Sequence, residues 1–196
     1  ARVDQLAREV LGESYLHLRL ERTAVDEDVA EGRVTVRSVL SRSGTDEHIE
    51  LEGSGVGLVD AFFDAVVGRF ASEFPSLKTI KVSDFGLGSG FDSSHGRQSD
   101  AMALATLRIR NSQDNEFTFT ARAVSVTSAS LRTVLDALTF FLNSERAYVQ
   151  LHAALADARQ RRRSDLVERF RSQMGTLVTA TSYSEVIERL KRDGES

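Results

Sequence analysis

Two segments of this chain, about 70 residues apart, share one pattern, in which small residues precede a hydrophobic helical stripe. The first runs from Gly53 to Val67 and the second from Ser125 to Leu138, and strand-like sequence precedes each. Such a repeat predicts a duplicated β-rich-then-α unit, and duplicated units usually pair about a pseudo-twofold axis. Between two such units, the first N–H groups of the helices suit a small anion such as an amino-acid carboxylate.

The composition is that of a soluble globular protein. The chain has 196 residues, of which 41% are hydrophobic and 28% charged, enough for one domain and an appendage. A formal net charge of −4 disfavours nucleic-acid binding, and no apolar run approaches the ~20 residues of a membrane span. Cysteine is absent and the N-terminus is polar, so we expect a cytoplasmic protein without disulfides, thiolate metal sites or cofactors. The first residue is alanine, which is compatible with a piece of a longer chain.

Hydrophobic periodicity predicts an α+β fold, with two βββα units related by a pseudo-twofold and a helical C-terminal tail. A short helix over residues 2–11 leads in. The predicted strands and closing helices are, in order, strands from about 15–20, 33–40 and 49–51, a helix over 58–70, strands over 77–82, 103–110 and 116–124, and a helix over 129–143. Residues 86–100 are rich in glycine and serine and are predicted to form a loop. We therefore divide the chain into a lead-in (1–14), a double βββα domain (15–143) and a tail (144–196).

The tail has its own pattern. Residues 145–172 are predicted to form one or two helices, and a loop over 175–182 leads to a last amphipathic helix. Ser182 and Glu185 have the spacing of a capping box at the start of that helix. Arginines crowd the stretch 159–171, but acidic residues interleave with them, which favours a solvated, salt-bridged helix face.

Three glycines, Gly53, Gly55 and Gly57, form the turn before the first closing helix. Such a turn can hold a phosphate or carboxylate, or can simply be required by a tight strand-to-helix connection. The Lys-Ser/Thr pair of a P-loop and the spacing of a dinucleotide-binding fingerprint are both absent, so we do not expect a nucleotide site.

Acidic residues and a histidine in and beside the 86–100 loop match no metal-ligand spacing, and a solvated loop is the simpler interpretation. They are Asp84, Asp92, His95 and Asp100. The serines at the two helix starts have no His/Asp partners at recognisable spacing. We therefore expect no metal site and no catalytic residues.

Four motifs together resemble the C-terminal regulatory domain of the 2-isopropylmalate synthase family, which citramalate synthases share. Gly53-x-Gly55-x-Gly57-x-Val59-Asp60-Ala61 is similar to that family's Gly-x-Gly-x-Gly-Pro-Val-Asp-Ala signature, with Leu58 in place of the proline. The other three are Val82 to Phe85, where Phe85 replaces a tyrosine, Ser99 to Ala101 before an alternating strand, and the turn and helix from Ser125 to Val134. The resemblance covers about residues 15–143.

The resemblance implies a double βββα domain that forms a homodimer and binds an end-product amino acid, leucine or isoleucine, at the dimer interface. Carried over by position, the effector-binding residues are Val59, Asp60, Val82, Phe85, Ser89, Val126, Thr127 and Ser128. Asp60 is expected to pair with the amino group of the effector. The family's catalytic barrel is not in this sequence, so the chain alone is not expected to be an enzyme.

Three functional hypotheses follow from the sequence. The first is a non-catalytic allosteric and dimerisation domain that binds a branched-chain amino acid and controls an attached or separate catalytic barrel. The second is an interaction module that kept the fold and lost the effector. The third, an independent enzyme that uses the 86–100 loop, has the least support because no catalytic set converges there.

Overall fold

The computed structural model describes residues 2–89, 102–181, 186–188 and 190. The first unit and the helices before it are α1 (Arg2–Leu11), the 3-10 helix η1 (Gly12–Ser14), β1 (Leu18–Asp28), β2 (Arg33–Arg42), β3 (His48–Gly55) and α2 (Leu58–Phe70). The second unit and the helix after it are the 3-10 helix η2 (Pro75–Thr79), β4 (Lys81–Ser89), β5 (Ala103–Arg110), β6 (Glu116–Ala123), α3 (Val126–Gln160) and α4 (Ser164–Leu177).

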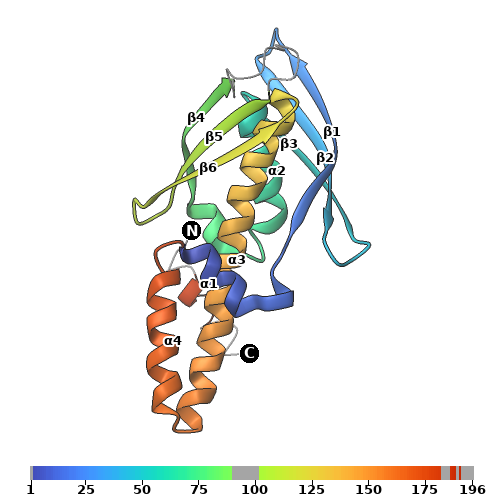
Figure 1. Ribbon diagram of the computed structural model, residues 1–196. Coiled ribbons are helices and arrows are strands. Elements are labelled where there is room, and N and C mark those ends of the chain that lie inside the picture. Colours follow the sequence, from blue (N-terminus) through green and yellow to red (C-terminus); the bar gives the residue numbers. More distant parts are fainter. Residues whose placement is uncertain (1, 90–101, 182–185, 189, 191–196) are drawn as a thin grey trace, which may run out of the picture.

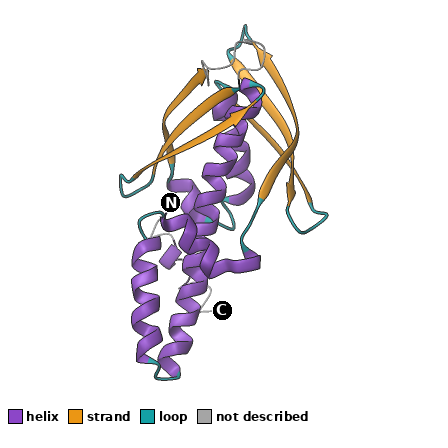
Figure 2. Cartoon of the chain, viewed as in Figure 1, coloured by secondary structure: helices purple, strands orange, loops and turns teal. Residues whose placement is uncertain are grey.

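The six strands in the described part of the chain form two separate antiparallel sheets, in the orders β1-β2-β3 and β4-β5-β6. α2 packs on β2 and β3, α3 packs on β5 and β6, and the two helices pack against each other. Figure 1 and Figure 2 show both helices between the two sheets. The predicted α+β fold of two βββα units with a helical C-terminal region is therefore confirmed.

The repeat extends to single residues. The helix N-caps are Gly57 and Ser125, 68 positions apart, and the same offset relates the buried residues Ala61 and Ala129 in the first turns. Each unit also carries a strand irregularity in its first strand, between Leu20 and Arg22 and between Val82 and Asp84. The second irregularity lies 62 positions after the first, not 68, so the two units differ in length between this point and the N-cap.

Several bounds differ from the sequence prediction. β1 ends at Asp28, eight residues beyond the predicted strand 15–20, and β3 covers His48–Gly55 rather than 49–51. Residues 77–79, predicted as strand, belong to η2, which starts at Pro75, and proline favours the first position of a helix. Residues 86–89, predicted as loop, continue β4, because pairing with β5 satisfies their backbone groups despite two glycines. The remainder of that loop up to residue 100, and the predicted capping box at Ser182 and Glu185, lie outside the described residues.

α3 is one continuous helix of 35 residues, so its predicted end at Asn143 is wrong. It contains no glycine or proline and is about 52 Å long at 1.5 Å per residue. Beyond Asn143, its buried side chains Tyr148, Leu151 and Leu155 form a second core with α1 and α4. The lead-in helix and the tail thus share one hydrophobic cluster, and tertiary packing carries α3 past the end of the sheets.

Two buried polar side chains near the middle of α3 bind the segments that lead into the sheets. The amide of Asn143 accepts a hydrogen bond from the N–H of Leu16 at 2.8 Å and donates one to the Leu16 carbonyl at 2.9 Å. The carboxylate of Glu145 accepts from the N–H of Ser76 at 3.1 Å and from its hydroxyl. Asn143 and Glu145 are both fully buried, so both connections are made away from water.

The glycines before α2 allow β3 and α2 to pack closely. A Cβ atom added to Gly53 would lie 2.7 Å from the Cβ of Ala65 and nearer still to the Ala61 carbonyl. One added to Gly55 would lie 2.7 Å from the N of Ala61. The structure therefore gives Gly53 and Gly55 a packing role, whereas Gly57 has open space around its Cα.

We expect Asn143→Ala to lower the free energy of unfolding by about 3 kcal/mol, because it leaves the buried N–H and C=O of Leu16 without their partner. Gln150→Ala is the control, since it removes an exposed amide on the same helix that also bonds a backbone carbonyl, that of Val10. Urea unfolding of both variants would measure the difference. Equal small losses would contradict the role given to Asn143.

We also expect Gly53→Ala and Gly68→Ala to change stability in opposite directions. Gly53→Ala should lower the free energy of unfolding by about 2–3 kcal/mol through overpacking against α2. Gly68 lies in α2 with open space around it, so alanine there should raise the free energy of unfolding by about 0.5–1 kcal/mol. Thermal unfolding compares the two, and a neutral Gly53→Ala would show that β3 and α2 can separate without cost.

Candidate functional site

The candidate site is the end of the domain at which α2 and α3 both begin (Figure 1). Gly57 and Ser125 are the N-caps, and both have extended backbones. The first N–H groups of a helix have no partner within the helix, and its N-terminus carries a partial positive charge. Two equivalent helix starts at one end of a pair of packed helices therefore make a region suited to a small anion.

At the start of α2, Asp60 stabilises the turn that precedes the helix. Its Oδ2 accepts a hydrogen bond from the N–H of Val56 at 3.1 Å, and the side chain is exposed. Val59 is half-buried and packs against the main core. One oxygen of the Asp60 carboxylate thus stabilises the glycine turn. The other oxygen makes no hydrogen bond to a described residue.

At the start of α3, serines make the cap. Ser125 Oγ accepts from the N–H of Ser128 at 3.0 Å, and the two hydroxyls lie 2.9 Å apart. Ser130 donates from its hydroxyl to the Val126 carbonyl at 2.8 Å. Thr127 is half-buried, whereas Val126 is about half exposed. These hydroxyls therefore bond to the helix backbone, and Val126 is an apolar side chain that the first turn of α3 exposes to solvent.

The residues expected from β4 are spread along the strand. Phe85 packs against the small cluster of Ala105, Ala123 and Ala129, beside the first turn of α3. Ser89 pairs with Ala103 at one end of the strand, and Val82 pairs with Ile109 toward the other end. At 3.4 Å per residue, Val82 and Ser89 are about 24 Å apart. The structure thus brings Phe85 to the start of α3 and places Val82 away from Ser89.

Two valines that the sequence analysis did not select mark this end of the domain. Val56 and Val124 each directly precede an N-cap, occupy equivalent positions in the repeat, and are 85% and 91% exposed. Each is thus an apolar side chain in water at the start of a helix. The signal was present in the sequence, since each valine stands between small residues that leave it little to pack against.

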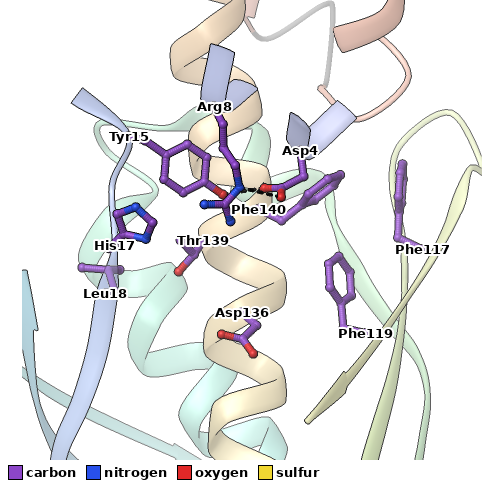
Figure 3. A pocket seen from close by; sticks show the side chains of 10 residues that line it. All are labelled: Asp4, Arg8, Tyr15, His17, Leu18, Phe117, Phe119, Asp136, Thr139 and Phe140. Carbon is purple, nitrogen blue, oxygen red and sulfur yellow. Dashed lines mark hydrogen bonds and ion pairs between the residues drawn. The ribbon is translucent and has the colours of Figure 1, made fainter. Parts of the chain in front are cut away.

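A second region of interest is a pocket of about 470 Å³ between α1, the chain leading into β1, β6 and α3 (Figure 3). On its α1 side, the Tyr15 hydroxyl donates to Asp4 Oδ1 at 2.5 Å and Arg8 Nε donates to Asp4 Oδ2 at 2.9 Å. The guanidinium of Arg8 also lies 4.3 Å from the centre of the Tyr15 ring. These contacts fasten α1 to the beginning of the first sheet.

Burial and neighbouring charged groups shift the pKa values of three side chains that line this pocket. Burial and the neighbouring Asp4 carboxylate raise the pKa of the Tyr15 phenol well above its ordinary value. Burial also tends to raise the pKa of Asp4, but hydrogen bonds from Tyr15 and Arg8 outweigh it and the pKa is lowered. On the opposite wall, the protein atoms around Asp136 raise its pKa although Arg132 opposes the shift, and the Asp136 side chain itself remains exposed.

Other sites considered from the sequence are not assembled by the described residues. Within the described ranges, no three His, Asp or Glu side chains are arranged to hold a metal ion, and no described helix is long and apolar enough to cross a membrane. Asp84 forms an ion pair with Arg108 on the neighbouring strand. Asp92, His95 and Asp100 lie outside the described residues.

Comparison with known proteins agrees with this architecture. The family model described as the LeuA allosteric (dimerisation) domain matches residues 1–142, that is, α1, both sheets, α2 and the first half of α3. No curated protein gives a significant match. The chain therefore belongs to the LeuA allosteric (dimerisation) domain family, the regulatory part of LeuA-type synthases.

Proposed function

We propose that this domain senses a branched-chain amino acid at the starts of α2 and α3, between two copies of the chain, and so controls a catalytic barrel in the cytoplasm. The observation that carries the proposal is the pair of equivalent helix starts, each preceded by an almost fully exposed valine. Membership of an allosteric and dimerisation family supports regulation and dimer formation. The barrel is either attached to this domain or separate from it.

The proposed chemistry uses three kinds of group. The N–H groups in the first turns of α2 and α3 bind the effector carboxylate. Val126 and Phe85 provide apolar contacts for a branched side chain. The Asp60 oxygen that is not bonded to the N–H of Val56 faces the ammonium group.

The same region explains how an effector would act on a dimer. Val56 and Val124 are too exposed to contribute to the core of one copy, and a second copy would remove them from water. An effector bound there contacts both copies, so it favours the arrangement of subunits that it fits best. Such coupling is typically worth about 1–3 kcal/mol. The controlled reaction would join acetyl-CoA and a 2-oxo acid to give a 2-alkylmalate.

An interaction module that has lost its effector is the second candidate. It is favoured by the helices that follow residue 142, because they extend beyond the family match and share a core with α1. Such a module would keep the dimer and the exposed valines without amino-acid binding. The two candidates therefore differ in ligand response and agree on assembly.

We expect leucine, isoleucine or valine to raise the unfolding temperature, since a ligand at 100 times its Kd adds about 2.7 kcal/mol. Val126→Asp should abolish the response, because the new carboxylate repels the effector carboxylate while an acid remains favourable in a first helical turn. Ser164→Asp is the control, because it places an acid at the first position of α4. A folded dimer that responds to none of the three amino acids would favour the interaction module.

We expect the double variant Val56→Glu and Val124→Glu to be monomeric at micromolar concentration, while the unmodified chain is dimeric. The added carboxylates would have to be desolvated at the interface without partners. Ser172→Glu, on the exposed side of α4, is the control for added charge. Light scattering measures the mass of each protein, and a dimeric double variant would place the interface elsewhere.

A further inference from the structure

The pocket in Figure 3 lies far from the helix starts. Its α3 residues Asp136, Thr139 and Phe140 follow Val126 by 10 to 14 positions, or about 15–21 Å along the helix. The edge strands β1 and β6 flank it, and α1 closes one end. A ligand here would contact parts of the chain that the helix-start site does not include.

The α3 wall of the pocket carries the exposed carboxylate of Asp136 and the buried hydroxyl of Thr139. Asp136 makes no hydrogen bond or ion pair with any described residue, and Arg132, one turn earlier, is the charge that acts on it. The hydroxyl oxygen of Thr139 is buried and has no hydrogen-bond partner in the described part of the chain. An unsatisfied buried hydroxyl is costly and calls for a specific reason. The exposed Asp136 carboxylate can accept from an ammonium group, and the Thr139 hydroxyl can join it after a rotation about χ1 that brings its oxygen to the pocket surface.

The α1 side of the pocket carries Arg8, which is paired with Asp4. Arg8 uses its Nε for Asp4, and its two terminal nitrogens bond to no residue among those described. Figure 3 shows the guanidinium above Thr139, between Tyr15 and Asp4. Stacked on Tyr15 and bonded to Asp4, the guanidinium keeps two nitrogens whose N–H groups suit a carboxylate.

The third wall is aromatic. Phe117 and Phe119 on β6 lie 5.5 and 5.4 Å from Phe140, measured between ring centres. Phe117 and Phe119 are only partly buried, so their ring surfaces toward the pocket remain available for an apolar group. Carboxylate, hydroxyl, guanidinium and aromatic groups thus surround a space of a size typical of small-molecule sites.

We propose that this pocket binds an apolar α-amino acid, with its ammonium group on Asp136 and Thr139, its carboxylate on Arg8, and its side chain against the phenylalanine wall. This site is separate from the helix starts, and it does not depend on the function proposed there. The ligand would join α1 to α3 and β6, and would therefore fix the N-terminal helix on the domain.

Calorimetry of the purified chain with three related probes tests the assignment. L-phenylalanine carries both charges, 2-phenylethylamine lacks the carboxylate and 3-phenylpropanoate lacks the ammonium. We expect saturable binding of L-phenylalanine and at least about tenfold weaker binding of each truncated probe, because each loses one charged hydrogen-bonded contact. Equal affinities for all three would show only apolar contact and would overturn the proposal.

Two variants separate ligand binding from stability. Asp136→Asn should weaken L-phenylalanine binding about tenfold or more, whereas Asp64→Asn, an exposed carboxylate on α2, should leave it unchanged. Thr139→Val removes the unpartnered hydroxyl at constant shape. It should keep or raise the unfolding temperature of the free chain and still weaken binding.

The outcomes also distinguish the two sites. Binding that survives Asp136→Asn and Thr139→Val but is lost in Val126→Asp would overturn the pocket assignment and leave the helix-start proposal standing. Loss in Asp136→Asn with retention in Val126→Asp supports the pocket. Absence of saturable binding by the unmodified chain, or a change in oligomeric mass caused by Asp136→Asn, would also overturn the assignment, the latter because it points to a second copy in the pocket.

Discussion

The structure depends on buried polar contacts at the middle of α3. Asn143 satisfies both backbone groups of Leu16, and Glu145 binds the N–H and hydroxyl of Ser76. One of these segments leads into the first sheet and the other into the second, so a single turn of helix fixes where both sheets begin. Hydrophobic packing alone would hold the sheets against α2 and α3 without setting their position along the helices. The directional hydrogen bonds of the Asn143 amide and the Glu145 carboxylate set that position. Because these groups are buried, any other position would leave them without partners at a cost in free energy.

Because of these contacts, α3 has a larger structural role than a helix that only closes the second unit. Its first half is the counterpart of α2 in the repeat, and its second half is the centre of the helical core with α1 and α4. Because the polar contacts lie between the two halves, the sheets and the helical region are fixed on one rod. If α3 tilted at its start, the buried contacts of Asn143 and Glu145, or the packing of the helical core beyond them, would therefore have to change as well.

Much of the fold could be predicted from the sequence because its signals are local. Alternating residues in β2 and β5 and the stripe in α2 gave these elements close to their observed bounds. The failures have tertiary causes. Residues 77–79 follow Pro75 and Ser76, and Glu145, far away in sequence, binds Ser76. α3 continues past Asn143 because α1 and α4 cover it. In the candidate site, the sequence motifs located both helix starts. The sequence could not show that Asp60 holds the turn before α2 or that Gly53 and Gly55 allow close packing of β3 and α2. Nor could it show that Val82 lies toward the far end of β4.

The pocket of Asp136 could not be predicted at all, because its walls come from four segments that only the fold unites. α1 contributes Arg8 and β6 contributes Phe117 and Phe119, whereas Asp136 and Thr139 belong to α3. Its position has a physical consequence. α1 is held by the cluster it shares with α3 and α4 and by the bonds among Asp4, Arg8 and Tyr15. A zwitterion spanning Arg8 and Asp136 would add a charged bridge between α1 and the part of α3 that faces the sheets. The start of α3 and its segment 136–140 would then respond to ligands through the same buried contacts, since both lie in the half of the helix that precedes Asn143 and Glu145.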